Sequence, residues 1–126
     1  MDAYARKLFS IAAGFNFAVA AGLWLLRDQM GAILDLDAIT GTNVAFTYFA
    51  AALVASYGYA YACIAYDPRK YRVYIPLGVI GKLMAVGAVC WPWHLGEVSW
   101  RLPGLASGDL VFAALFLDYL RRTGRV

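Results

Sequence analysis

Apolar residues run almost without interruption through four stretches of this chain, and short polar segments separate them. The stretches are Leu8–Leu26, Val44–Tyr66, Val73–Trp93 and Leu102–Leu120. Each is close to the roughly 20 residues that an α-helix needs to cross the hydrocarbon core of a bilayer. The apolar residues do not alternate with polar ones, which argues against a membrane β-barrel. The pattern therefore predicts an all-α integral-membrane four-helix bundle that forms one domain over residues 1–126.

The composition agrees with this pattern. Of the 126 residues, 63% are hydrophobic and 15% are charged, far from the averages of soluble domains. So few residues lie outside the four stretches that a soluble domain is not expected. The formal net charge is +3. The positions of the basic residues are explained by the orientation of the chain in a membrane, so no nucleic-acid partner is expected.

The basic residues gather in three places that four spans would bring to one side of a membrane. They precede the first span, separate the second from the third, and follow the fourth: Arg6, Lys7, Arg69, Lys70, Arg72, Arg121, Arg122 and Arg125. The other two connections hold four of the eight acidic residues, Asp28, Asp35, Asp37 and Glu97. Because Lys and Arg are enriched in cytoplasmic loops, the sequence predicts cytoplasmic N- and C-termini.

Four polar residues lie at similar depth within the apolar stretches: Lys82, Asp109, Asn16 and Ser56. Counted from the predicted cytoplasmic ends at about 1.5 Å per residue, their depths are about 14 to 18 Å, near the bilayer centre. A lysine at that depth normally faces the bundle interior and pairs with a carboxylate or with carbonyl groups. Asp109 is the only carboxylate at matching depth, so we predict that Lys82 and Asp109 face one another.

Three interpretations of this polar layer remain open. It is an interhelical ion pair satisfied by Asn16 and Ser56, or it is a working proton or ligand site that uses the same residues. In the third, Ser107 caps a shorter last helix, Asp109 lies in the first turn, and Lys82 has another partner.

Other chemistry is less well supported by the sequence. Cys90, His94 and Glu97 could supply metal ligands, but the string lacks a second cluster and has little specificity. With one histidine no serine–histidine–acid triad is credible, and no glycine-rich phosphate loop follows a strand. We expect no cofactor and no bound metal, and we favour a protein that is not an enzyme.

Small residues spaced by four occur in all four stretches, which is typical of helices packed within a membrane. Aligning residues 14–24 with residues 81–91 pairs Gly14 with Gly81 and Trp24 with Trp91. This alignment raises the alternative that the protein consists of two helical hairpins in parallel orientation, with a site near their interface.

The segments AYDPRKY, GVIGKLMAV and ASGDLVFAALFLDYLRR resemble a group of small bacterial four-helix membrane proteins of uncharacterised function. The overall layout is also similar to that of DoxX-like proteins, although no motif residues match. The resemblance implies a multi-pass protein of the bacterial inner membrane. From the whole pattern we expect an accessory subunit or a binder of a small amphipathic ligand. The alternative is a proton-coupled transporter or conducting unit that uses Lys82 and Asp109. The expected partners are the lipid bilayer and either further copies of the chain or a larger membrane complex.

Overall fold

The computed structural model describes residues 2–124, which form five helices and contain no strand. The helices are α1 (Asp2–Leu25), α2 (Arg27–Ile33), α3 (Thr42–Tyr66), α4 (Tyr74–His94) and α5 (Arg101–Thr123). All except α2 are long and apolar enough to cross a membrane. The prediction of an all-helical chain with four helices of spanning length is therefore confirmed. Arg125, one of the basic residues in the orientation argument, lies outside the described residues.

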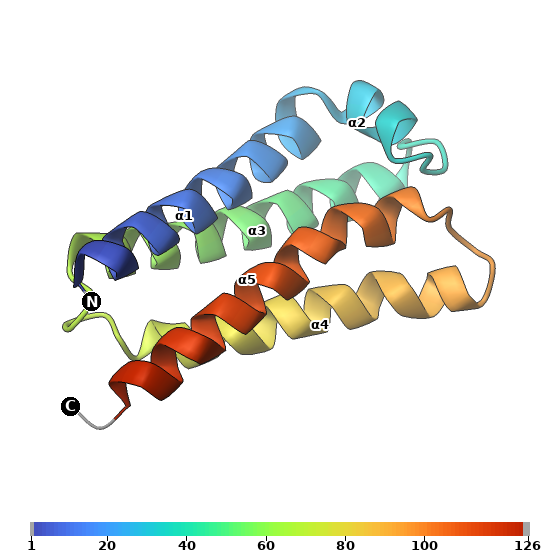
Figure 1. Ribbon diagram of the computed structural model, residues 1–126. Helices are drawn as coiled ribbons and strands as arrows, with labels where there is room; N and C mark the ends of the chain where they lie inside the picture. Colours follow the sequence, from blue (N-terminus) through green and yellow to red (C-terminus); the bar gives the residue numbers. More distant parts are fainter. Residues whose placement is uncertain (1, 125–126) are drawn as a thin grey trace.

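The four long helices form two hairpins. α1 packs mainly on α3, α4 packs mainly on α5, and the hairpins meet chiefly through α3 and α4. Figure 1 shows that the start of α1 and the end of α5 lie at the same end of the bundle, whereas α2 lies at the opposite end. We call these the termini end and the α2 end. The structure thus places both termini together, and the assignment of that end to the cytoplasm stays a prediction.

The α3–α4 connection begins at an Asp-Pro pair. Asp67 has extended backbone angles, φ −145° and ψ 92°, as expected for a residue before proline. Its amide donates a hydrogen bond to the Cys63 carbonyl at 3.0 Å, and its carboxylate accepts one from the Lys70 amide at 3.2 Å. The Asp side chain therefore begins a new turn where proline stops the helix.

α2 was not predicted as a helix, and three contacts connect it and its flanking residues to the bundle. At the corner between α1 and α2, the Trp24 ring stacks on Tyr48 of α3 with centroids 4.4 Å apart, and Arg27 donates a hydrogen bond to the Tyr48 hydroxyl at 2.9 Å. At the far end of α2, Arg101 of α5 donates a hydrogen bond to the Ile33 carbonyl at 3.3 Å. The short helix thus contacts both hairpins.

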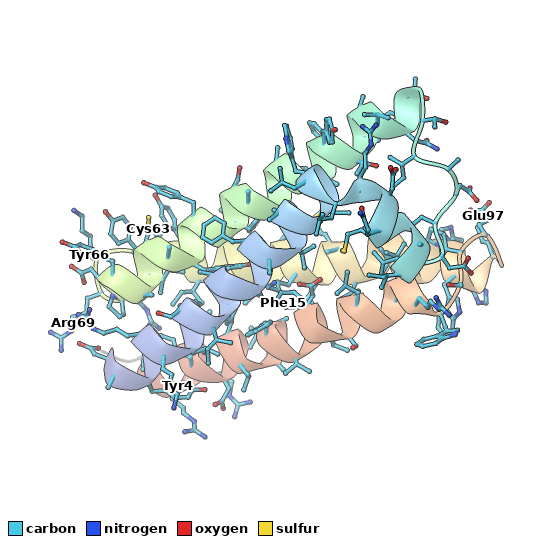
Figure 2. The ribbon with its side chains drawn as sticks, turned by 90° about the horizontal axis from the view of Figure 1, so that it is seen from above. Tyr4, Phe15, Cys63, Tyr66, Arg69 and Glu97 are labelled. Atoms are coloured by element: carbon cyan, nitrogen blue, oxygen red, sulfur yellow. The ribbon has the colours of Figure 1, made fainter. Side chains whose placement is uncertain are left out.

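The tightly packed core lies in the half of the bundle nearest the termini. It is made of Ala5, Leu8, Phe9, Ala12 and Ala13 of α1, Tyr61 and Ile64 of α3, Ile75 and Val79 of α4, and Phe116 and Tyr119 of α5. Phe9 stacks on Phe116 with ring centroids 4.6 Å apart, and Tyr61 lies 5.3 Å from the same ring. In Figure 2, Tyr4 and Cys63 mark this half, and Glu97 marks the α2 end.

Glycines of α4 receive tyrosine rings of α3 where the two hairpins meet. A Cβ atom at Gly78 would lie 2.8 Å from Cε1 of Tyr61, and one at Gly81 would lie 2.5 Å from Cε1 of Tyr57. Such distances are shorter than van der Waals contact, so the rings occupy space that any other residue would fill. The small residues noted in the sequence therefore accommodate aromatic side chains here, and not only the close approach of two helix backbones.

Candidate functional site

A chain of hydrogen bonds crosses the middle of the bundle and joins all four long helices. The Lys82 ammonium of α4 lies 2.6 Å from Oδ1 of Asp109 of α5 and 2.8 Å from Oδ1 of Asn16 of α1. The Asn16 amide nitrogen in turn donates to the Val54 carbonyl of α3 at 3.0 Å. The structure therefore brings together three of the four polar residues singled out from the sequence, and it adds a backbone acceptor.

Aromatic rings from three helices surround the Lys82 ammonium. Phe15 of α1, Tyr61 of α3 and Phe112 of α5 each have their ring centroid 5.2 Å from Nζ. A cation within about 6 Å of a ring centroid is attracted by the ring quadrupole. Because the lysine side chain is only 3% exposed, the rings and two oxygen acceptors replace the hydration of its charge.

Asn16 is the polar link between the two hairpins, because Lys82 and Asp109 both belong to the α4–α5 hairpin. Its carbonyl oxygen accepts from the ammonium, and its amide donates within its own hairpin, so both ends of the side chain have matching partners. Gly58 makes room for it: a Cβ atom at that position would lie 3.2 Å from Cβ of Asn16. The asparagine is thus held by contacts on both sides.

Asp109 is less enclosed than its partner. Its side chain is 20% exposed, against 3% for Lys82. Among residues 2–124, the Lys82 ammonium is the only group that donates a hydrogen bond to the carboxylate, and it reaches Oδ1 alone. Since no buried side-chain atom in that range lacks a partner, Oδ2 lies at an accessible surface. The carboxylate can therefore accept a further hydrogen bond from a ligand, a proton donor or water.

Ser56 does not join this group, so the expectation that it satisfies the Lys82–Asp109 pair is wrong. Its side chain is exposed, and its hydroxyl donates to the Ala52 carbonyl of its own helix at 2.8 Å. Counting residues fixes the depth of a side chain but not its direction. Because successive residues of a helix turn by about 100°, Ser56 points almost opposite to Val54 and Gly58, two positions away on either side.

The alternative in which Ser107 caps a shorter last helix is also wrong. α5 begins at Arg101, and Ser107 lies inside it with its hydroxyl bonded to the Gly104 carbonyl at 2.6 Å. Pro103 lies in the first turn, where its missing amide hydrogen removes no helical hydrogen bond. Asp109 is therefore a mid-helix residue, as its pairing with Lys82 requires.

A cavity of about 380 Å³ separates the two hairpins at the α2 end. Its apolar lining comes from Leu23, Leu34, Leu36, Ile39, Phe46, Ala50, Val98, Leu102 and Leu105, and its polar lining from Asp35, Asp37, Asn43, Thr47 and Glu97. Sites for small molecules commonly have volumes of about 300 to 1,000 Å³ and combine apolar walls with a few polar groups. The cavity is therefore large enough for a small amphipathic molecule.

The cavity approaches the polar layer from the α2 end. Leu105 lines it and lies one helical turn before Asp109 on α5, and Ala50 lines it one turn before Val54 on α3. Residues four apart share one face of a helix. The partly exposed carboxylate of Asp109 is therefore on the same face of α5 as the cavity wall.

The structure does not support a metal site at Cys90, His94 and Glu97. Between residues 2 and 124, no three His, Cys, Asp or Glu side chains come close enough together to hold a metal ion, and this includes Cys90, His94 and Glu97. His94 ends α4, with its ring 5.8 Å from that of Trp91.

Sequence reasoning missed the aromatic rings and the carbonyl acceptor. Phe15 precedes Asn16 and Phe112 follows Asp109 by three residues, so their proximity to the polar layer could have been found from the sequence. The Val54 carbonyl could not, because every residue carries one. Comparisons of this chain with protein-family models, with curated proteins and with solved structures found no match.

Proposed function

We propose that this is a multi-pass protein of the bacterial inner membrane that binds a small amphipathic ligand between its two hairpins. The observation that supports the proposal is the 380 Å³ cavity at the α2 end, with apolar walls and a polar rim. An apolar part would lie against Leu23, Phe46 and Leu105. The ionisable lining residues are all acidic, so a head group that donates hydrogen bonds or carries a positive charge fits better than an anion.

The polar layer would serve this function as a fixed support for the cavity. Lys82 is fully surrounded, and Asn16 links it to the other hairpin. The two hairpins are thereby held at a defined separation beside the cavity. Such positioning by satisfied side chains is what a preorganised site requires.

Short-chain amphiphiles with different head groups test this proposal. Octyltrimethylammonium, octyl glucoside and octyl sulfate would be added, below micelle-forming concentrations, to protein purified in a maltoside detergent. We expect the ammonium compound to raise the unfolding midpoint by at least about 3 °C, the glucoside to raise it less, and the sulfate not to raise it.

Two tryptophan variants of α5 provide the matched comparison. Leu105→Trp fills the cavity and should abolish the rise, whereas Leu110→Trp, at a position 51% exposed on the outer surface, should keep it. Equal responses of wild type and Leu105→Trp to every amphiphile would argue against a ligand site in this cavity.

The second candidate is a proton-coupled transporter or conducting unit, and the partial exposure of Asp109 is what favours it. A carboxylate of which one oxygen accepts no hydrogen bond from residues 2–124 could exchange a proton with its surroundings. Reconstituted vesicles with a pH-sensitive dye inside would measure this activity. Proton flux that Asp109→Asn abolishes would support the candidate, and flux equal to that of empty vesicles would argue against it.

The same proposal includes three further points. The chain resembles small bacterial membrane proteins, both of its termini lie in the cytoplasm, and it assembles into an oligomer or a larger membrane complex. The three basic clusters support the orientation.

A further inference from the structure

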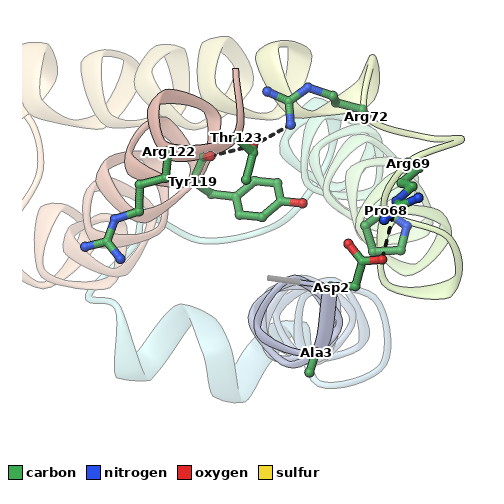
Figure 3. Close-up of a pocket in the computed structure, with 8 residues that line it drawn as sticks. All are labelled: Asp2, Ala3, Pro68, Arg69, Arg72, Tyr119, Arg122 and Thr123. Atoms are coloured by element: carbon green, nitrogen blue, oxygen red, sulfur yellow. Dashed lines mark hydrogen bonds and ion pairs between the residues drawn. The ribbon is translucent and has the colours of Figure 1, made fainter. Parts of the chain in front are cut away.

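A second cavity lies at the termini end, where it borders Tyr119 of the packed core, and it has a volume of about 740 Å³. Its lining comes from three separate parts of the chain, as Figure 3 shows: Asp2 and Ala3 of α1, Pro68, Arg69 and Arg72 of the α3–α4 connection, and Tyr119, Arg122 and Thr123 of α5. Three arginine side chains and one carboxylate thus line a single opening, and the Arg122 guanidinium points outward from it in Figure 3. The polar layer and the ligand cavity at the α2 end use none of these residues.

Arg72 is fixed in place by α5. It donates hydrogen bonds to the Thr123 hydroxyl at 2.6 Å and to the Leu120 carbonyl at 3.3 Å, and its guanidinium lies 5.9 Å from the Tyr119 ring centroid. The Thr123 hydroxyl donates to the Tyr119 carbonyl at 2.7 Å. Carbonyl groups at a helix C-terminus repel anions. Here two of them already accept hydrogen bonds, which reduces that repulsion.

Arg69 and Arg122 are held only loosely. The Arg69 side chain is 85% exposed and lies 3.5 Å from Asp2, and that of Arg122 is 66% exposed and lies 3.1 Å from Asp118. In both ion pairs the nitrogen involved is Nε, and exposed pairs of this kind are weak. The terminal nitrogens of both arginines donate no hydrogen bond to residues 2–124, so they can bind another group.

We infer that this cavity binds a phosphate group that carries negative charge. Guanidinium groups match the planar arrangement of two phosphate oxygens and bind them through paired hydrogen bonds. Arg72 would supply a fixed positive charge, and Arg69 and Arg122 would close on the phosphate from opposite walls. The Tyr119 side chain adds a surface between them. Either the head group of an anionic phospholipid or a soluble phosphate compound carries the required chemistry.

The position of the cavity favours the lipid source. It lies where four helices of membrane-spanning length end, which is the level of the lipid head groups if these helices cross a bilayer. Basic side chains at that level attract anionic lipids. The preference for the lipid rests on the proposed membrane location and not on the ligand proposed for the α2 end.

The experiment measures phosphatidylglycerol binding to the full chain in detergent, by unfolding midpoint and by native mass spectrometry. Phosphatidylcholine with the same acyl chains is the lipid control, and glycerol 1-phosphate represents a soluble source. We expect phosphatidylglycerol alone to stabilise the protein and to remain bound. Stabilisation by glycerol 1-phosphate, with displacement of the lipid, would support the site and assign it to soluble phosphates. Equal binding of both lipids, with no effect of glycerol 1-phosphate, would overturn the inference.

Two charge-matched double variants locate the site. Arg69→Gln with Arg122→Gln removes the two loosely held arginines, and we expect at least about tenfold weaker binding, because hydrogen bonds to charged groups are lost. Lys70→Gln with Arg121→Gln removes the same charge from the neighbouring exposed positions, which do not line the cavity, and should change binding less than about threefold. Equal losses in both variants would show general surface attraction and overturn the inference.

A third variant keeps the charge and changes only the shape of the donors. Arg69→Lys with Arg122→Lys should weaken binding several-fold, because an ammonium group cannot bind two phosphate oxygens as a planar fork does. Unchanged binding in this variant would contradict recognition by the guanidinium groups. Since it retains both positive charges, it also serves if the glutamine variant does not fold.

Discussion

Lys82 carries a charge in the middle of the bundle, and neighbouring groups compensate it. An ammonium group in a bilayer centre costs about 3 kcal/mol or more when it is unpaired. Here two oxygen acceptors and three aromatic rings from neighbouring helices surround it. Each of these groups therefore stabilises the bundle mainly by compensating the buried Lys82 charge. Removing any one of them leaves that charge less well compensated.

A double-mutant cycle tests this dependence. We expect Lys82→Met and Asp109→Leu each to destabilise the protein by about 3 kcal/mol, because each leaves a buried charge without its partner. The double variant should lose much less than the sum, because no charge remains to be compensated. Reversible unfolding of the purified protein in mixed micelles measures all four forms. Strictly additive losses would show that the two residues act independently.

Asn16 and Ser56 make a second test at this scale, since they have similar predicted depth but different surroundings. Asn16→Leu removes both hydrogen bonds between Lys82, Asn16 and Val54, and we expect it to destabilise by about 1 to 3 kcal/mol. Ser56→Ala should change stability by less than about 0.5 kcal/mol, because the exposed hydroxyl bonds only its own helix. The same unfolding measurement serves for both, and a larger effect for Ser56→Ala would contradict the described geometry.

At the scale of helices, the contact between α3 and α4 depends on rings placed over glycines. Tyr61 is only 1% exposed and lies where a Cβ atom at Gly78 would be, so the ring has little room to move. The two hairpins have different environments here. Gly14, which aligns with Gly81 in the suggested duplication, has no atom within 4 Å of an added Cβ. The two glycines therefore do not have equivalent packing roles.

Two alanine substitutions in α4 should separate packing from helix propensity. Gly78→Ala should destabilise the protein by about 1 to 3 kcal/mol, because the new methyl group overlaps Tyr61. Gly87→Ala, with open space around the new atom, should be neutral or stabilising by up to about 1 kcal/mol, because alanine favours a helix over glycine. Thermal unfolding of both variants measures the two effects. Equal unfolding midpoints would mean that the Tyr61 ring can move aside for the new methyl group.

The positions of the long helices could largely be predicted from the sequence. The long apolar stretches locate the four long helices to within a few residues at most ends, because length and hydrophobicity determine them. α1 starts earlier than expected, at Asp2, since charged residues extend a helix beyond its apolar part. The sequence also brought Lys82, Asp109 and Asn16 together by depth. Rotation about each helix axis depends on packing between helices, so Ser56 was wrongly included.

At the scale of the whole molecule, the bundle is unequal at its two ends. The core residues lie in the half near the termini, while the α2 end contains a cavity between the hairpins. Ligand sites are often found where packing between structural units is incomplete. The two hairpins are therefore packed against each other in the half near the termini and separated by a cavity at the α2 end, whereas the 740 Å³ cavity lies among the helix ends and the α3–α4 connection.

The placement of both termini at one end predicts a common side of the membrane. Reporter fusions at the N- and C-terminus should give the same result, and the positive-inside bias predicts that both reporters lie in the cytoplasm. A reporter in the α2–α3 connection, at Ala38, should give the opposite result. Opposite locations for the two termini would be incompatible with four spans.

The location of both charged partners within one hairpin has a consequence for how the protein is made. Lys82 and Asp109 are separated by 27 positions along the chain and belong to consecutive long helices. If the long helices cross a bilayer, the α4–α5 hairpin can therefore enter the lipid with its two charges already neutralising each other. Membrane helices are commonly inserted first and associated afterwards. Asn16 belongs to the first hairpin, so its carbonyl oxygen would accept the hydrogen bond from Lys82 when the two hairpins associate.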